Sequence, residues 1–167
     1  MVEQFLNLFW IIYVKGSRMP KVVTCLLMNE DKLLILKRSD KVRTYKGLWG
    51  GVAGYVEKGE EPYGTALKEI KEEIGMEGED VNLVRRCDPF TFIDYHEGKK
   101  YDWTIYPFLF RIREKDKVQI DWEHSKYKWI SPLDIGRYDT VPHLKDIVFK
   151  NFDKNSRMRE RGGGEER

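Results

Sequence analysis

The chain has 167 residues, 41% hydrophobic and 35% charged, which is enough for one globular domain with a sizeable core. Its 30 basic and 28 acidic residues nearly balance, which argues against a strongly basic nucleic-acid binder and against an acidic tail protein. The two cysteines, Cys25 and Cys87, are too few for a disulfide framework or a tetrahedral zinc site, so we expect a cytoplasmic protein.

The two ends of the chain differ in composition from its middle. Residues 5–14 are mostly apolar, but this run is shorter than the roughly 20 residues that a membrane-spanning helix needs. Two interpretations of residues 1–18 stay open: an extra element that packs on the domain, or an upstream sequence before a natural start at Met19. Residues 153–167 are charged and rich in glycine, so we expect a disordered charged tail. This division leaves residues 19–152 as the domain.

The first half of the domain predicts a hairpin followed by one charged helix. Residues 22–28 and 32–37 are short apolar runs joined by Asn29-Glu30-Asp31, which is typical of a β-hairpin. Further along, Pro62 suits the first turn of a helix and Gly75 its C-terminal cap. A glycine-rich stretch lies between the hairpin and this helix.

The second half predicts more strands and a late helix. The expected elements are, in chain order, a strand over 82–95, a turn over 96–100, a strand over 101–113, a strand over 126–130, a helix start at Ser131 and an amphipathic helix from Thr140 through Phe149 with Leu144, Ile147 and Val148 on one face. Mixed strands with a central and a late helix favour an α/β or α+β sandwich over a regular alternation of strand and helix.

The helix from Pro62 carries three acids on one arc. At about 100° per residue, Glu69, Glu72 and Glu73 fall within an arc of roughly 100°. Their like charges repel, and the C-terminal end of a helix disfavours anions. A solvated helix face is one interpretation of this pattern, and a site for a hard divalent cation with oxygen ligands is the other. The neighbouring face is an apolar stripe that would pack on a sheet, formed by Tyr63, Ala66, Leu67, Ile70 and Ile74.

The segment from Gly54 reads GYVEKGEEPYGTALKEIKEEIGM and resembles the signature of the Nudix hydrolases. That signature is Gly, five residues, Glu, seven residues, Arg-Glu, an aliphatic residue, any residue, Glu-Glu, any residue, Gly and an aliphatic residue. Eight of its nine specified positions match, and Lys68 stands where the family has Arg. The resemblance implies a Nudix-type α/β/α sandwich with a mixed β-sheet. It also implies hydrolysis of a nucleoside diphosphate linked to another group, with Mg²⁺ or Mn²⁺.

The resemblance further implies roles for individual residues. Glu69, Glu72 and Glu73 would be catalytic metal ligands, and a backbone carbonyl of Gly54, or of Ala53 beside it, would add an oxygen. Glu60 would support the loop–helix geometry or hold metal through water. Lys68 keeps the positive charge of the family Arg but loses its planar fork, which places the positioning of the site in question.

Residues outside the signature are candidates for the general base and for substrate contacts. Glu123, just before a predicted strand, is the candidate base, and Glu97 is a weaker one. His124 is more typical of a surface or capping histidine. The candidates for substrate binding are Arg38, Lys46, Trp49 and Lys68. Further aromatics expected near the pocket are Phe90, Phe92, Tyr95, Tyr101 and Trp103.

The expected partner is a small-molecule nucleotide, with no membrane and no nucleic acid, and the protein is expected to be a monomer or homodimer. Two other functions are consistent with a Nudix-type fold. One is a catalytically weak module that senses a nucleotide, for which Lys68 is the only sign in the sequence. The other is an isomerase of the isopentenyl diphosphate type, which the intact acids of the signature disfavour.

Overall fold

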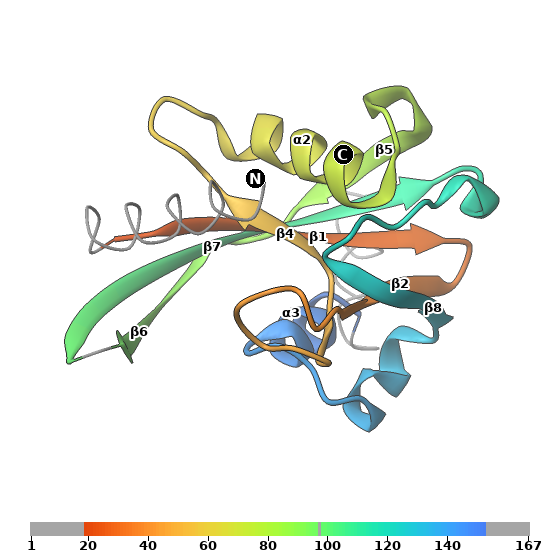
Figure 1. Ribbon diagram of the computed structural model, residues 1–167. Coiled ribbons are helices and arrows are strands. Elements are labelled where there is room, and N and C mark those ends of the chain that lie inside the picture. Colours follow the sequence, from red (N-terminus) through yellow and green to blue (C-terminus); the bar gives the residue numbers. More distant parts are fainter. Residues whose placement is uncertain (1–18, 97, 153–167) are drawn as a thin grey trace, which may run out of the picture.

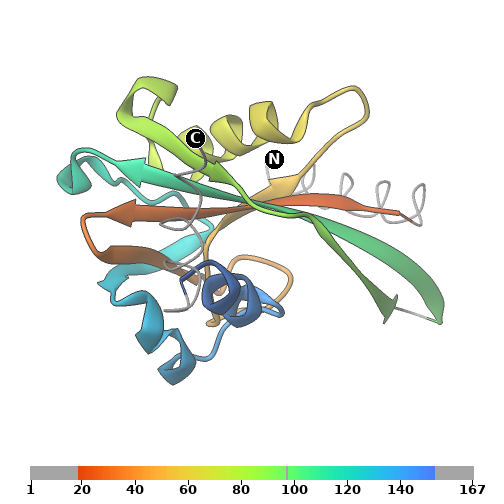
Figure 2. The ribbon, with the colours of Figure 1, turned by 180° about the vertical axis from the view of Figure 1, so that it is seen from behind.

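The computed structural model describes residues 19–96 and 98–152. The predictions for residues 1–18, for Glu97 and for residues 153–167 lie outside the described residues. Figure 1 shows a central β-sheet with helix α2 (Pro62–Ile74) on one face and helix α3 (Leu144–Phe152) on the other, and Figure 2 shows the same layers from behind. The prediction of an α/β/α sandwich is therefore confirmed. None of the helices in these two ranges is long and apolar enough to cross a membrane.

The described strands form one mixed sheet. In chain order they are β1 (Lys21–Asn29), β2 (Lys32–Arg38), β3 (Trp49–Gly50), β4 (Val52–Tyr55), β5 (Val81–Arg86), β6 (Phe90–His96), β7 (Lys99–Ile112) and β8 (His124–Ile130). Three short 3₁₀ helices lie in the connections: η1 (Gly78–Asp80) between α2 and β5, η2 (Lys115–Lys117) between β7 and β8, and η3 (Pro132–Arg137) between β8 and α3. Strand β1 is central, because it runs parallel to β7 and antiparallel to β2 and β4. The sheet is mixed for this reason.

The predicted hairpin is confirmed as β1 and β2, but the predicted strand over 82–95 is wrong. It is two strands, β5 and β6, which both pair with β7. Cys87, Asp88 and Pro89 separate them, and a proline has no N–H to donate to a β-ladder. The break allows one long strand, β7, to receive two shorter partners in succession along the same edge.

The predicted C-terminal helices are shifted or changed in type. Ser131 precedes a 3₁₀ helix, η3, and α3 begins at Leu144 rather than Thr140. Pro142 disfavours the helical conformation for the residue before it, and His143 has a positive φ of 67°, so the regular helix starts only after both. Leu144, Ile147 and Val148 are buried as predicted.

The core lies in two layers, one on each face of the sheet. On the α2 face, the predicted stripe is confirmed, since Ala66, Ile70 and Ile74 are fully buried and pack against the inner strands. Burying an isoleucine side chain stabilises a fold by about 1.5–3 kcal/mol. Gly75 ends α2 in the left-handed conformation, with φ of 70°, as its position in the sequence predicted. The packed stripe fixes which edge of α2 faces β4, and hence where the acids lie.

Candidate metal and active site

The side chain of Glu60 links the loop between β4 and α2 to the first turns of α2. Its carboxylate accepts hydrogen bonds from the backbone N–H of Glu57 at 3.2 Å, the hydroxyl of Thr65 at 3.0 Å and the ammonium of Lys68 at 3.2 Å. Partial burial opposes ionisation of Glu60, but these three donors outweigh it and hold the pKa of Glu60 below its usual range. Lys68 therefore contacts the loop acid Glu60, and the two together attach the loop to the first turns of the helix.

Gly54 and Glu69 are in close approach across the β4–α2 interface. A Cβ atom added to Gly54 would overlap the carboxyl group of Glu69, so any larger residue at this position would displace the Glu69 side chain. Burial and the neighbouring Glu72 raise the pKa of Glu69 from 4.5 to about 7, while Lys68 opposes the rise. Glu69 is thus a carboxylate pressed against the backbone of β4, with acidic neighbours.

We call the signature segment, residues 54–76, the box, and its three acids Glu69, Glu72 and Glu73 the box acids; Glu73 is the most buried of them. It is 4% exposed, and its Oε1 atom accepts a hydrogen bond from the backbone N–H of Ala53 at 3.3 Å. Burial, followed by the charges of Glu123 and Glu69, raises the pKa of Glu73 well above its usual range. Glu72 is exposed at the same edge of the helix. The three acids that the helical periodicity placed on one arc therefore differ in burial: Glu73 is buried, Glu69 is half-buried and Glu72 is exposed.

The segment before β8 brings a fourth acid to this cluster. Glu123 is half-buried, and burial together with Asp121 raises its pKa, while His124 and Arg38 oppose the rise. The charge of Glu123 in turn raises the pKa values of Glu69 and Glu73. The sequence separates Glu123 from the box helix by about fifty residues, and the fold places it within electrostatic reach of the box acids.

The prediction of a surface or capping role for His124 is wrong. Its side chain is buried, because the first residue of β8 points into the protein, and the whole residue is 6% exposed. The Nδ1 atom lies 3.1 Å from Oδ1 of Asp121, and the Nε2 atom lies 3.5 Å from Oε2 of Glu73. Sequence reasoning also missed Asp121, whose position two residues before Glu123 was the available signal.

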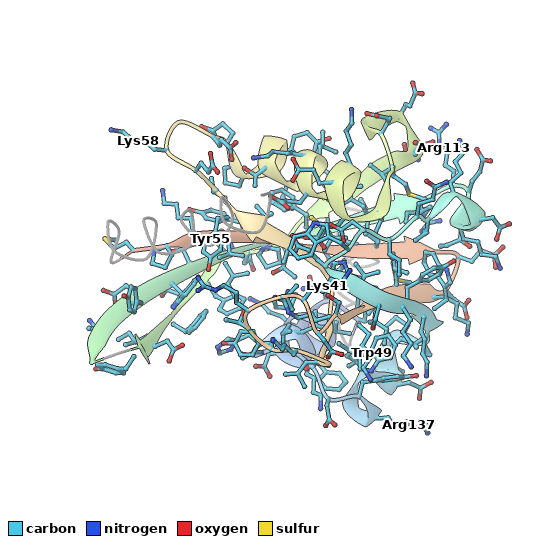
Figure 3. All side chains as sticks on the ribbon, in the orientation of Figure 1. Lys41, Trp49, Tyr55, Lys58, Arg113 and Arg137 are labelled. Carbon is cyan, nitrogen blue, oxygen red and sulfur yellow. The ribbon has the colours of Figure 1, made fainter. Side chains whose placement is uncertain are left out.

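The predicted substrate-binding residues do not all lie together. Arg38 is half-buried beside Glu123, and its Nε donates to the carbonyl of Thr44 at 2.9 Å. Lys46 is exposed in the β2–β3 loop. Trp49 lies on the α3 side of the sheet (Figure 3), is 7% exposed and packs edge-on against Tyr138 at 5.6 Å. A ring buried in this way offers little surface on which a base could stack.

The comparisons with known proteins agree with this geometry. The family model of the NUDIX domain matches residues 18–152. The chain belongs to the Nudix family. Among curated relatives, nucleoside triphosphatase NudI of Escherichia fergusonii is 28% identical over 143 residues, covering 81% of this chain and 99% of its own. NudI of Escherichia coli O139:H28 is 30% identical over 129 residues, covering 73% and 89%.

Solved structures share the Nudix fold at lower sequence identity. An Ap4A hydrolase of C. elegans in a binary complex superposes with a TM-score of 0.65 at 20% identity, covering 84% of this chain and 98% of its own. The E. coli dihydroneopterin triphosphate pyrophosphohydrolase has the same TM-score and identity, covering 83% and 97%. The family and its curated NudI members identify the chain as an enzyme, a Nudix pyrophosphohydrolase.

The acidic cluster fits a hard divalent cation. Carboxylate and carbonyl oxygens are the ligands that such ions prefer, and a buried set of like charges is unfavourable until a cation neutralises it. No three acidic, histidine or cysteine side chains within 19–96 and 98–152 already surround one point in a ligand arrangement. Binding would therefore involve rotation of the side chains, above all of the exposed Glu72, on a fixed helix.

A cavity of about 610 Å³ lies on the opposite face of the sheet, between α3 and the connection from β5 to β6. Two rings that line it, His143 and Phe92, belong to a row of contacting aromatic side chains that continues through Trp103 and Tyr55. Phe92 lies 4.1 Å from the ring of His143 and stacks on Trp103 at 6.0 Å with an angle of 4°, and Trp103 lies 5.9 Å from Tyr55. Tyr55, at the end of this aromatic row, is the last residue of β4 and follows Gly54 directly in the sequence. Of the other predicted pocket aromatics, Phe90 also lines the cavity, Tyr95 is exposed and Tyr101 is buried.

Proposed function

We propose that the protein hydrolyses the pyrophosphate linkage of a nucleoside diphosphate joined to another group, with Mg²⁺ or Mn²⁺ bound at the box acids. The observation that carries the proposal is the acidic cluster, in which the charge of Glu123 raises the pKa values of both Glu69 and Glu73, and the charge of Glu69 raises that of Glu73. A polyphosphate is itself anionic and would be repelled by these carboxylates. Cations between the two remove the repulsion, polarise the phosphoryl oxygens and acidify the attacking water.

Each residue of the cluster has a distinct part in this proposal. Glu69, Glu72 and Glu73 would hold the cation, together with the backbone carbonyl of Gly54 or Ala53. Glu60 would act indirectly, since its carboxylate already receives three hydrogen bonds that shape the loop. Holding the reactants in place and stabilising developing charge supply most of the rate in phosphoryl transfer.

Glu123 is the group that would accept the proton of the attacking water. A base works best when its pKa lies near the working pH, and burial moves the pKa of Glu123 in that direction. Arg38, held beside Glu123 by its bond to the Thr44 carbonyl, would contact a phosphate oxygen. Lys46, on the adjacent loop, is the second candidate for a phosphate contact.

The nucleoside would lie on the aromatic row of Tyr55, Trp103, Phe92 and His143. Stacking of a base on an aromatic side chain contributes roughly 1–3 kcal/mol in single-strand binders, and every base offers a π-face. The names of the relatives refer to a nucleoside triphosphatase, an Ap4A hydrolase and a dihydroneopterin triphosphate pyrophosphohydrolase. We accordingly expect a small nucleotide as substrate rather than a nucleic acid.

The experiment is a substrate panel with Mg²⁺ or Mn²⁺, containing nucleoside triphosphates, Ap4A and ADP-ribose, in ¹⁸O-labelled water. We expect metal-dependent release of a mononucleotide, with the label on one of the two phosphate products. Glu79→Gln is the matched control because Glu79 is exposed in η1, away from the box acids. Absence of turnover for every member of the panel would reject the proposal.

Two further inferences concern the setting of the enzyme. Cys25 and Cys87 are both free thiols, which supports a cytoplasmic location. The enzyme would act as a monomer or homodimer, which sedimentation of the full chain measures directly.

A further inference from the structure

The segment that precedes β8 is fixed to the end of α2 that carries Glu73. The backbone N–H of Gln119 donates to the carbonyl of Ile74 at 3.0 Å, and that of Asp121 donates to the carbonyl of Glu73 at 3.1 Å. These carbonyls belong to the last turn of the helix, where no helical N–H is available to them. The segment therefore caps the helix and holds Asp121 in a fixed place beside Glu73.

The side chains of this segment complete a closed set of contacts. Oδ1 of Asp121 accepts a hydrogen bond from the backbone N–H of Glu123 at 3.1 Å and lies 3.1 Å from Nδ1 of His124. The other ring nitrogen of His124 lies 3.5 Å from Oε2 of Glu73. Each ring nitrogen of His124 therefore faces one carboxyl group, and the tautomer decides which nitrogen carries the proton.

Both oxygens of the Glu73 carboxylate thus have a neighbour that can donate to them. Ala53 supplies its backbone N–H to Oε1 from β4, and His124 faces Oε2 from β8. A buried carboxylate needs such donors, and two donors from opposite sides also fix its orientation. The imidazole in turn is oriented by Asp121, which is attached through its backbone to Glu73 itself.

We propose that Asp121 and His124 form a positioning pair for the active site. Asp121 orients the imidazole, the imidazole fixes the carboxylate of Glu73, and the same Asp121 oxygen fixes the backbone of Glu123. The pair would therefore link one metal ligand to the general base, and neither member would touch the substrate. This inference rests on the proposed function, because it assigns the pair to the metal site named there.

Three substitutions at His124 separate a donor role from a space-filling role. His124→Phe keeps a ring but removes both nitrogens. His124→Gln places an amide N–H₂ near the position of Nε2, facing Glu73, and His124→Asn places one near Nδ1, facing Asp121. The Mn²⁺ dissociation constant of the full chain is measured without substrate by electron paramagnetic resonance, and kcat and KM are measured at saturating Mg²⁺. Tyr127→Phe, at an exposed position of β8, is the control.

We expect His124→Phe to weaken Mn²⁺ binding by about 10–100-fold, as is typical when a group that orients a metal ligand is removed. We also expect kcat to fall with little change in KM, and His124→Gln to recover most of both losses while His124→Asn does not. Wild-type affinity and kcat in His124→Phe, or equal losses in the Gln and Asn variants, would overturn the proposal. If the Phe variant does not fold, the comparison of Gln with Asn decides alone. Failure of the proposed function would instead appear as absence of Mn²⁺ binding in the wild type.

Discussion

The raised pKa of Glu69 predicts that its ionised carboxylate destabilises the protein when no metal is bound, and replacement of Glu69 by Gln tests this prediction. The pKa of Glu69 is raised from 4.5 to about 7 in the folded protein. Between these two values the folded state binds more protons than the unfolded state, so stability falls as the pH rises through this window. Each pKa unit corresponds to about 1.4 kcal/mol, which gives about 3 kcal/mol for the full shift. Because Glu69 is partly exposed and water screens its charge, we expect half of that, ~1.5 kcal/mol.

Glu69→Gln should therefore raise the free energy of unfolding by ~1.5 kcal/mol at pH 8 and leave it unchanged near pH 4. The assay is urea unfolding with EDTA at both pH values, followed by circular dichroism. Saturating Mg²⁺ should reverse the order of stability at pH 8, since binding to the native state at 100 times the dissociation constant adds about 2.7 kcal/mol to the wild type. The exposed Glu79→Gln serves as control. Equal gains at both pH values, or a loss at pH 8, would refute this reasoning.

Three further predictions concern other parts of the site. Glu123→Gln should lower kcat by about 10²–10⁴-fold with Mn²⁺ binding retained, and near-normal kcat would remove Glu123 from the role of general base. Gly54→Ala should weaken Mn²⁺ binding because the new methyl overlaps the carboxyl of Glu69. The control Gly64→Ala, at a position of α2 that is open to solvent, should keep Mn²⁺ binding and raise the free energy of unfolding by about 0.5–1 kcal/mol. Equal Mn²⁺ binding in the two variants would contradict the close approach of Gly54 and Glu69. Trp103→Ala should raise KM by a factor that corresponds to roughly 1–3 kcal/mol, measured by steady-state kinetics, and an unchanged KM would place the base elsewhere.

The box helix could be predicted from the sequence because its information is local. The apolar stripe, the terminal Pro62 and Gly75 and the spacing of the acids all depend on residues within one helix, and the structure has each of them. The break between β5 and β6 could also have been predicted from Pro89, since a proline interrupts a β-ladder. The β-type residues on both sides of it favoured one continuous strand instead.

The environment of the site depends on contacts between distant segments. His124 lies in a polar stretch, and β8 shows no alternation of buried and exposed residues that would mark one inward side chain. Its burial follows from the attachment of residues 119–121 to the end of α2, which no local pattern encodes. Trp49 differs from its prediction in the opposite way. Its place near the box in the sequence suggested a substrate contact, but its ring is buried against Tyr138.

The most direct test of a metal-dependent pyrophosphohydrolase centred on the box acids is the turnover of the best panel substrate as a function of Mg²⁺ concentration. We expect the wild type and Glu79→Gln to show the same saturable dependence on Mg²⁺ and no turnover in EDTA. The Glu72→Gln/Glu73→Gln double variant should show no turnover at any Mg²⁺ concentration. Turnover in EDTA, or full turnover in the double variant, would contradict the assignment.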